Sequence, residues 1–594
     1  VLTTGLWLTN LVGQVTLQTK EQVLTYAALP QETIYVHLNT SFFLTGEYLY
    51  YKLYCFEGEA GELTTLSKVA YVELVDENSQ PIFRHKILLE NGQGQGDFFI
   101  PAQIASGNYK LIAYTRFMGN KKDRSFYQKD IAIVNPYRSN QPELQNSLTN
   151  SDSLLIKKAG ILSNTKAKNN KPENSGPLDL VLNDESFGKR SRVGVTLKHT
   201  GKNRTVTGNY SLSVRKKDLA VETFEENIAE FFMRLTPSGT QLAPEIGDSI
   251  VLPELRGELF HGKIIAARGN KSVSDLKVAA SIPGQDFTVE IAQTDTKGNF
   301  FFNVSKNYSG DKLVLQVLSQ NPEDYKVRID EPNIIDYSKL AFKEVQLDFS
   351  TRKEILRRSI HNQIENSFFQ FRPDSILTLL PSYFLDKKEC KTYVLDDYTR
   401  FKTLRETLVE IVQDVSSKRI GPDNSAIRVK GYDYASITDI PPLVLLDGCL
   451  VQNHNGLLDL DTRLVEKIDV YRHKLVLGPE VYEGALVLRT KDGYGYESVQ
   501  NAESVSVVEL LKPQIDRKYF VQRYDTVGSN NKSSKLPDDR LQLLWIPDLE
   551  VTGTDFETDF YTSDVMGEYE IRLEGITDKN EPVSIRKWFV VGKD

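Results

Sequence analysis

"TIYVHLNTSFFLTGEYLYYKLYCFEG", residues 33–58, is the stretch that decides the fold class of this chain. Apolar and polar side chains alternate along most of it, and it is rich in Tyr, Phe and Thr, which is the pattern of strands with one buried face. The same pattern continues to about residue 137 and is interrupted by short turn signals. We therefore predict one β-sandwich over residues 29–137. The turn signals are Thr45-Gly46, Glu77-Asn78, Asn91-Gly92 and Ser106-Gly107.

The composition of the whole chain is ordinary for a globular protein. Hydrophobic residues make up 40% and charged residues 26% of the 594 residues, which excludes a wholly disordered chain and a polytopic membrane protein. At ~150 residues per domain, this length predicts about four domains. The formal net charge of -8 creates no field that would attract a polyanion, so we expect no nucleic-acid partner.

Cysteine and histidine form no metal or redox motif. The three cysteines, Cys55, Cys390 and Cys449, lie far apart and fit no CxxC pattern, and the seven histidines are scattered singly without HExxH. The sequence also contains no GxSxG elbow, no GxxxxGK[ST] loop and no calcium loop of the DxDxDG kind. We therefore expect no cofactor, no metal, no disulfide framework and no enzymatic activity.

The first 14 residues, "VLTTGLWLTNLVGQ", look like the apolar region of a secretory signal peptide whose basic start is missing. The alternative is a first strand or a buried apolar N-terminus. No later stretch reaches the ~18 apolar residues that a membrane-spanning helix needs. We expect an exported protein of the periplasm or the outer membrane, either soluble or peripherally associated with a membrane.

The remaining chain divides into segments that differ in composition and in hydrophobic periodicity. Residues 138–177 are rich in Asn, Ser, Lys and Pro, which predicts a flexible linker. The later segments alternate like strands, except for a helical region that follows an N-cap at Ser350. Leu356, Ile360, Ile364 and Phe368 repeat every four positions there, which predicts a helix with one apolar face. The predicted domains are a second β domain at 178–253, a third β-sandwich at 254–345, a helical connector at 346–390, an α+β domain at 391–497 and a C-terminal β-sandwich at 500–594.

The segment "PLVLLDGCLV", residues 442–451, raises the question of a functional carboxylate. Asp447 ends an apolar run, as a catalytic or metal-binding aspartate would, but Asp-Gly is also the strongest signal of a two-residue hairpin turn. The turn is favoured, so Asp447→Asn is expected to be nearly silent and Gly448→Val to disrupt folding. The polar residues that follow could offer oxygen ligands to a hard cation, but a polar hairpin leading into a helix N-cap is favoured. They are Asn453, His454, Asn455, Asp459 and Asp461.

Four segments follow one another in this part of the chain: "AIRVKGY", "PLVLLDGCLV", "LLDLDTRLVEKIDVYR" and "GALVLRTKDG". Their order resembles that of the plug domain of TonB-dependent outer-membrane receptors. In that family a strand ends in an "IDG"-type turn, a helix leads into "VE.IEV", and a last strand reads "G.I.I.TK.G". The matching residues here are Leu446, Asp447 and Gly448, then 465–470, then 484–493. The residues after Gly493 are too few for the many ~10-residue transmembrane strands of such a receptor, so we expect a plug-like module without a pore of its own.

Two further segments carry resemblances. "IYVHLNTSFFLTGEYLYYKLY" resembles the MG2 domain of α2-macroglobulin-like proteins, with Thr45 in place of the proline of the "Y.PGE" turn, and residues 257–304 resemble a carboxypeptidase-regulatory-like sandwich. The combination is similar to large envelope proteins of Bacteroidota-type bacteria. The expected fold is mainly β: several immunoglobulin- or macroglobulin-like β-sandwiches in series plus one small α+β plug-like domain.

These resemblances imply a non-enzymatic, exported scaffold or binding protein of the bacterial cell envelope. Its expected partner is an envelope or outer-membrane protein, such as a TonB-dependent barrel. One alternative is a macroglobulin-like protein that interacts with proteases without a thioester, because no cysteine lies in a "GCGEQ"-like context. Residues 138–177 would then be its bait, which limited proteolysis followed by a compaction assay would test. The other alternative is a glycan-binding protein, which an exposed Trp or Tyr in a groove would support.

Overall fold

The computed structural model describes most of the chain, and three of the predictions above fall outside the described residues. These are the signal-peptide remnant at 1–14, the N-cap at Ser350, and most of the linker or bait, residues 139–173. The described residues are 15–58, 61–120, 126–138, 174–201, 207–217, 226–234, 244–284, 286–304, 308, 310–330, 335–343, 351–377, 385, 390–421, 424–432, 440–499, 505–524 and 535–592.

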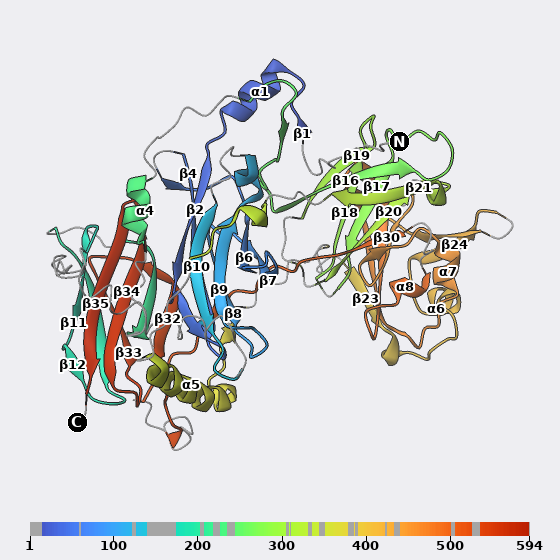
Figure 1. Cartoon of the computed structure of the whole chain (residues 1–594). Helices are drawn as coiled ribbons and strands as arrows, with labels where there is room; N and C mark the ends of the chain where they lie inside the picture. The colour runs from blue at the N-terminus through green and yellow to red at the C-terminus, as the bar shows by residue number, and fades with distance from the viewer. Residues whose placement is uncertain are drawn as a thin grey trace. The chain divides into compact units, whose positions relative to one another are not determined.

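The chain folds into two compact units, each assembled from separate stretches of sequence. Strands dominate both units (Figure 1), which confirms the predicted mainly β fold class. No described helix is long and apolar enough to cross a membrane. Unit 1 comprises Val1–Val15, Glu254–Asn333 and Leu379–Pro513, and unit 2 comprises Thr16–Pro253, Ile334–Thr378 and Gln514–Asp594.

The first sandwich of unit 2 is built from strands between Glu32 and Val134. One sheet has the order β3-β10-β9-β6-β7, and the other pairs β4 with β2, β5 and β8. Both sheets contribute inward apolar side chains to one core, which also takes in Ile335 from beyond the predicted end of this domain. The strands are β2 (Glu32–Leu38), β3 (Phe42–Leu44), β4 (Tyr48–Glu57), β5 (Glu62–Leu63), β6 (Val69–Asp76), β7 (Pro81–Leu88), β8 (Gln93–Phe99), β9 (Gly107–Tyr114) and β10 (Tyr127–Val134).

The prediction of two separate β domains at 178–253 and 500–594 is wrong, because both ranges contribute strands to the second sandwich of unit 2. Strand β14 lies between two strands from the C-terminal range, β32 and β34, and β13 pairs with β33, so both ranges build a single sandwich. Alternation marks a strand but does not identify its partner. The strands are β11 (Leu178–Leu182), β12 (Ser186–Phe187), β13 (Arg192–His199), β14 (Gly208–Lys216), β32 (Gln542–Val551), β33 (Asp555–Tyr561), β34 (Gly567–Thr577) and β35 (Pro582–Val591).

The predicted helix after residue 350 is present as α5 (Thr351–Ser367), but its apolar face is not the face that is buried. Arg358 and Ser359 are buried, whereas Leu356 and Ile360 are 60% and 49% exposed. The remaining short elements of this unit and its boundary are β1 (Val15–Thr16), α1 (Lys20–Ala27), η1 (Arg116–Asn120), α4 (Ile228–Arg234), β15 (Ser249–Ile250), η3 (Tyr337–Lys339), η4 (Phe369–Phe371), β22 (Ser375–Ile376) and β31 (Arg517–Lys518).

A buried carboxylate explains the orientation of α5. Glu47, which follows the predicted Thr45-Gly46 turn, accepts hydrogen bonds from Arg358 Nε (2.7 Å) and Nη2 (2.6 Å) and from Arg215 Nη2 (3.1 Å). Arg215 belongs to β14, so this one side chain ties the first sandwich to the second sandwich and to α5. The two guanidinium groups overcome the effect of burial and lower the pKa of Glu47 to about 2.

Unit 1 contains a sandwich whose second sheet includes a strand that is distant in sequence from the others. Strand β30 lies beside β20, so residues 505–509 belong to this sandwich and not to the predicted C-terminal domain. The sheets have the orders β19-β16-β21 and β18-β17-β20-β30. The elements are β16 (Glu258–Ala266), β17 (Lys277–Ile282), β18 (Thr288–Gln293), β19 (Asn299–Val304), β20 (Lys312–Leu318), η2 (Pro322–Asp324), β21 (Tyr325–Asp330) and β30 (Val505–Glu509).

The other part of unit 1 is an α+β module around the sheet β23-β28-β29-β26-β27. Val444 and Leu446 of β26 face the module's own core, whereas Leu443 and Leu445 share a core with Phe287 of the sandwich. Burial on both faces explains the unbroken apolar run "PLVLL". The elements are β23 (Cys390–Val394), η6 (Leu395–Asp397), α6 (Leu404–Glu410), β24 (Val415–Arg419), β25 (Ser425–Val429), β26 (Leu443–Leu446), β27 (Cys449–Leu450), α7 (His454–Leu458), β28 (Val465–Leu477), β29 (Glu480–Thr490) and α8 (Tyr496–Val499).

Candidate functional site

Asp447 and Gly448 form a two-residue turn between β26 and β27. Leu446 pairs directly with Cys449, and both turn residues have positive φ, 51° and 86°, as a type I′ hairpin requires. The turn packs closely against the sandwich, because a Cβ added at Gly448 would lie 2.2 Å from the Cβ of Phe287. The local sequence thus sets the shape of the turn, and the close approach to Phe287 makes glycine necessary at its second position.

The carboxylate of Asp447 is buried and organises a second loop. Its Oδ1 accepts a hydrogen bond from Thr490 N (2.7 Å), and its Oδ2 accepts from Thr490 Oγ1 (2.7 Å) and Gly495 N (2.8 Å). Asp447 therefore holds "TKDGYGY", residues 490–496, against the end of β26. The sequence offered no signal for this partnership, since the two segments are far apart along the chain.

Asp447→Asn should therefore not be silent, contrary to the expectation from sequence. An amide places an NH2 group where either Thr490 N or Gly495 N now donates, so one buried donor loses its acceptor. We expect unit 1 to lose about 1–3 kcal/mol of unfolding free energy, measured by urea denaturation. Asp397→Asn, at an exposed position of the same unit, is the matched control and should change stability by less than about 0.5 kcal/mol. Equal stabilities for the Asp447 variant and wild type would contradict this role.

The turn borders an open, charged cleft of about 470 Å³ within unit 1. The sandwich contributes Lys312 to its wall, and the α+β module contributes Arg489 and Tyr494. Tyr494 lines the cleft and is 57% exposed, whereas Tyr496 is buried and burial raises its pKa to about 12. Apolar and hydrogen-bonding surface thus lie side by side, as in sites that bind polar ligands or partner side chains.

The charges around the cleft are of both signs, and several are paired. Lys312 Nζ lies 3.1 Å from Glu497 Oε1 and Lys512 Nζ lies 3.7 Å from Asp311 Oδ2, both at the solvent-exposed rim. Exposed pairs of this kind contribute little to stability. The rim therefore offers charged side chains of both signs.

The polar residues after the turn serve local structure, as the N-cap interpretation predicted. Asn453 caps α7 by accepting hydrogen bonds from Asn455 N and Gly456 N. His454 Nδ1 accepts from Ile427 N (3.0 Å), and Asp461 forms an ion pair with Arg463 that lowers the pKa of the aspartate to about 2. Asp459 lies 3.9 Å from Arg405. Across the described ranges, no group of three or more His, Cys, Asp or Glu side chains is placed to hold a metal ion.

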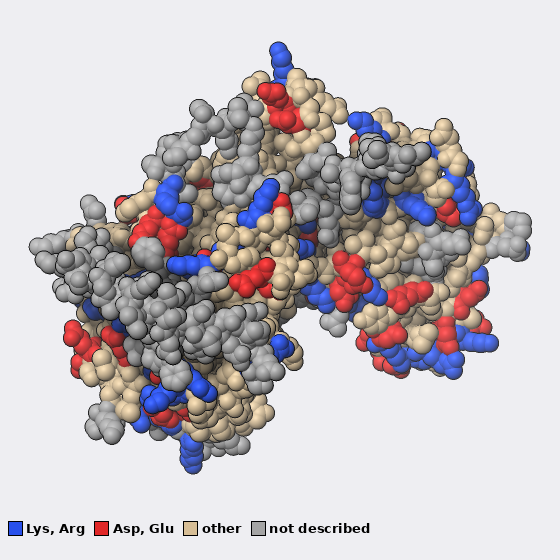
Figure 2. Space-filling model, viewed as in Figure 1, with Lys and Arg blue, Asp and Glu red and all other residues tan. Residues whose placement is uncertain are grey.

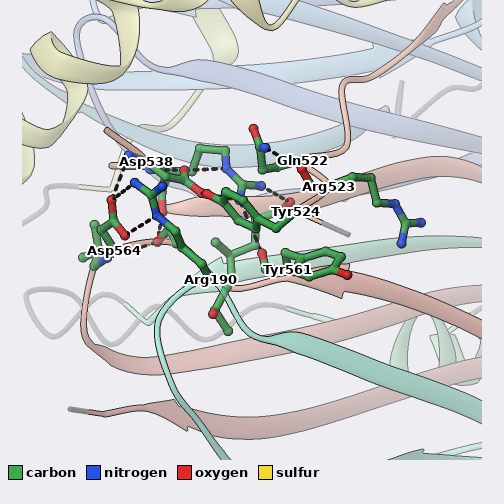
Figure 3. A network of polar contacts seen from close by, with 12 residues as sticks. Arg190, Gln522, Arg523, Tyr524, Asp538, Tyr561 and Asp564 are labelled. Atoms are coloured by element: carbon green, nitrogen blue, oxygen red, sulfur yellow. Dashed lines mark hydrogen bonds and ion pairs between the residues drawn. The ribbon is translucent and has the colours of Figure 1, made fainter. Parts of the chain in front are cut away.

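A second concentration of charge lies in unit 2, around the loop that precedes β32 (Figure 3). Asp538 accepts two hydrogen bonds from Arg540, both of 2.7 Å, and one from Tyr524 (2.6 Å). Arg190 donates hydrogen bonds to both carboxylate oxygens of Asp564. Burial would raise the pKa of Asp538, but Arg540 outweighs it and the pKa is lowered. Asp538 and Asp564 each meet an arginine, so these ion pairs join loops of the second sandwich.

Comparison with known proteins gives only distant likenesses. No protein-family model and no curated protein matches the chain. Among solved structures, Escherichia coli α2-macroglobulin activated by porcine elastase aligns at 9% identity over 95% of this chain and 44% of that chain, with a TM-score of 0.23. Salmonella α2-macroglobulin reacted with methylamine aligns at 11% identity over 95% and 39%, with a TM-score of 0.22. Dimeric latent PorU from Porphyromonas gingivalis aligns at 10% identity over 51% and 34%, with a TM-score of 0.15.

The chain spans less than half the length of these α2-macroglobulin chains. TM-scores of 0.23 or less leave function to be inferred from the chain's own residues. The β-sandwich construction is confirmed by the structure. The MG2-like, regulatory-like and plug-like identities of the individual modules stay predictions.

Proposed function

We propose that this chain is a non-enzymatic, exported multi-domain scaffold of the bacterial cell envelope that binds protein partners. The observation that carries the proposal is the exposed side chain of Tyr494, which lines the unit 1 cleft. Tyr and Arg are the side chains that most often supply the binding energy of protein interfaces, and Tyr494 and Arg489 line this cleft together. The cleft is the surface that we assign to partner binding.

The construction of unit 1 supports this assignment. The α+β module and the sandwich share an apolar core, and Gly448 fits against Phe287 without space for a side chain. Both walls of the cleft therefore belong to one packed body, and a cleft formed before binding loses little entropy when a partner docks. Charges of both signs are interspersed over the visible described surface (Figure 2), which suits a protein partner better than a polyanion.

The partner in this proposal is an envelope or outer-membrane protein, such as a TonB-dependent barrel. The support is the resemblance of residues 391–497 to a plug domain and of residues 1–14 to a signal peptide. Location in the periplasm or at the outer membrane is part of the same proposal.

Substitution of Tyr494 tests the proposal directly. Immobilised full-length chain should capture an outer-membrane protein from detergent-solubilised envelopes, and Tyr494→Ala should reduce capture at least tenfold, because loss of one central aromatic side chain costs about 2 kcal/mol or more. Tyr432→Ala is the matched control, since Tyr432 is 51% exposed in the same unit and does not line the cleft. Equal losses in both variants, or no captured envelope protein, would count against the proposal.

Glycan binding is the second candidate, and the same exposed tyrosine favours it. A sugar ring stacks on an aromatic face while its hydroxyl groups use the surrounding charged side chains. A carbohydrate array distinguishes the two candidates, because glycan binding predicts a signal that Tyr494→Ala abolishes in the absence of any protein partner.

A further inference from the structure

Unit 2 contains a second cleft, of about 490 Å³, which the proposed function does not use. It opens between the two sandwiches of this unit. One side comes from the end of β7, the Asn91-Gly92 turn and β8, and the other from the start of β14, the end of β32 and the turn that joins β34 to β35. The Asn91-Gly92 turn has positive φ at both residues, 48° and 72°, and the bridge between Glu90 and Gln93 closes it, so this edge of the cleft has a defined shape.

Carboxylates dominate the charged groups that line this cleft. One ammonium group, that of Lys52, accompanies them, and it lies 3.2 Å from Asp548 Oδ1 in a side chain that is almost fully buried. Asp548 Oδ1 also accepts a hydrogen bond from Asn209 Nδ2 (2.7 Å). The cleft keeps an excess of negative charge after this pairing. Its carboxylates are Glu90, Asp516, Asp548, Glu550 and Asp578.

Buried amide oxygens point to a ligand independently of the carboxylates. Gln95 lines the cleft and is 8% exposed, its Nε2 donates to Arg517 O (3.3 Å), and its Oε1 accepts no hydrogen bond. The Oε1 of Gln93 and the Oδ1 of Asn209, which line the same cleft, are likewise buried acceptors without a donor. A buried acceptor without a donor is costly, and three at one cleft match a ligand that brings several N–H groups.

The electrostatics of Asp516 agree with this chemistry. Burial raises the pKa of Asp516, and the nearby carboxylates of Asp548 and Glu90 raise it further against the opposing effects of Gln95 and Lys52. An arriving cation would relieve this repulsion. The described residues contain no group of three or more His, Cys, Asp or Glu side chains placed to hold a metal ion, and the acceptors of this cleft come from separate strands, among them β8, β14 and β32. They suit an extended organic cation.

We propose that this cleft binds the guanidinium or ammonium side chains of an arginine- or lysine-rich segment of a protein partner. A guanidinium carries five N–H donors, which is enough in number for a carboxylate and for the amide oxygens of Gln93 and Gln95. The proposal concerns unit 2 alone and stands whether or not the unit 1 cleft binds an envelope protein.

The probe is a fluorescein-labelled tetra-arginine peptide with blocked termini, titrated against the full chain at 0.15 M salt and followed by fluorescence anisotropy. We expect binding that weakens as salt rises, no binding of a tetra-glutamate peptide, and at least tenfold weaker binding by Asp516→Asn/Glu550→Gln. Gln95→Leu leaves the charge unchanged and should also weaken binding, at least threefold. Glu557→Gln removes a carboxylate of β33 outside the cleft and should bind like wild type.

Two results would overturn the proposal. Similar losses with Glu557→Gln and with the double variant would mean that the peptide senses only the overall negative charge. The second result is that 1 mM calcium chloride binds to wild type and displaces the peptide from it, but does not do so with the variants. The cleft would then be a metal site. Circular dichroism melts of each variant establish that it is folded, and Gln95→Leu tests the cleft without any change of charge.

Discussion

Glu47→Gln should lower the unfolding free energy of unit 2 by about 3–5 kcal/mol. Gln has nearly the same shape but no charge, so Arg358 and Arg215, with side chains 8% and 12% exposed, would lose the carboxylate that neutralises them. The expected cost comes mainly from leaving these cations in a buried site. Urea unfolding followed by tryptophan fluorescence measures it, because Trp545 and Trp588 both belong to unit 2.

The same carboxylate predicts how stability depends on pH. The pKa of Glu47 is lowered from 4.5 to about 2, so its contribution is fully present above pH 4.5 and is lost as the pH falls from 4.5 towards 2. Over that pH interval the unfolding free energy of wild type should fall by about 3 kcal/mol more than that of the Gln variant. The stability difference between the two proteins should therefore shrink with acidification.

Glu568→Gln is the matched control for this prediction. Glu568 pairs with Lys217 at 3.0 Å in the same unit, but both side chains are more than 40% exposed. Its loss should cost less than about 1 kcal/mol. A Glu47 variant that is no less stable than the control would show that the buried triad contributes nothing to the joint between the sandwiches and α5.

Gly448→Val should lower the stability of unit 1 by about 2–5 kcal/mol. Valine is strained at a φ of 86°, and its Cβ would lie 2.2 Å from Phe287 Cβ and 2.6 Å from Phe287 Cγ. The turn and the sandwich would have to separate, which opens the core that the two modules share. Differential scanning calorimetry of the full chain should show the loss as an earlier unit 1 transition.

Gly493→Val separates backbone strain from the steric clash. Gly493 has a φ of 77°, and no heavy atom of the described residues lies within 4 Å of an added Cβ. This control should cost only about 1–2 kcal/mol. If both variants were equally destabilised, the contact with Phe287 would play no part in holding the modules together.

Local signals predicted the local features well. Asn91-Gly92 and Asp447-Gly448 were predicted as turns from residue type, and both adopt positive φ at each residue. The helix at 351–367 was also predicted, but its inward face was not, because the four-residue apolar repeat carried no information about Glu47. A buried ion pair across more than three hundred residues leaves no periodic trace in either segment.

The binding surfaces were the least predictable part of the molecule. Asp447 was singled out from sequence, but its hydrogen bonds to Thr490 and Gly495 were not, and the expectation of a silent Asp447→Asn followed from that gap. The acidic cleft of unit 2 is lined by Gln95 and Asp516, which are distant in sequence and carry no shared motif.

The amino-acid sequence alone was sufficient for the mainly β class, the positions of most strands and the tight turns, because alternation and turn preferences act over a few neighbouring residues. Only the tertiary structure decided that β14 lies between β32 and β34, that Glu47 neutralises Arg358, and that two clefts form where separate segments meet. These features depend on pairing between distant residues. Such pairing follows from complementary shape and charge in the folded core, and it has no local signature in the chain.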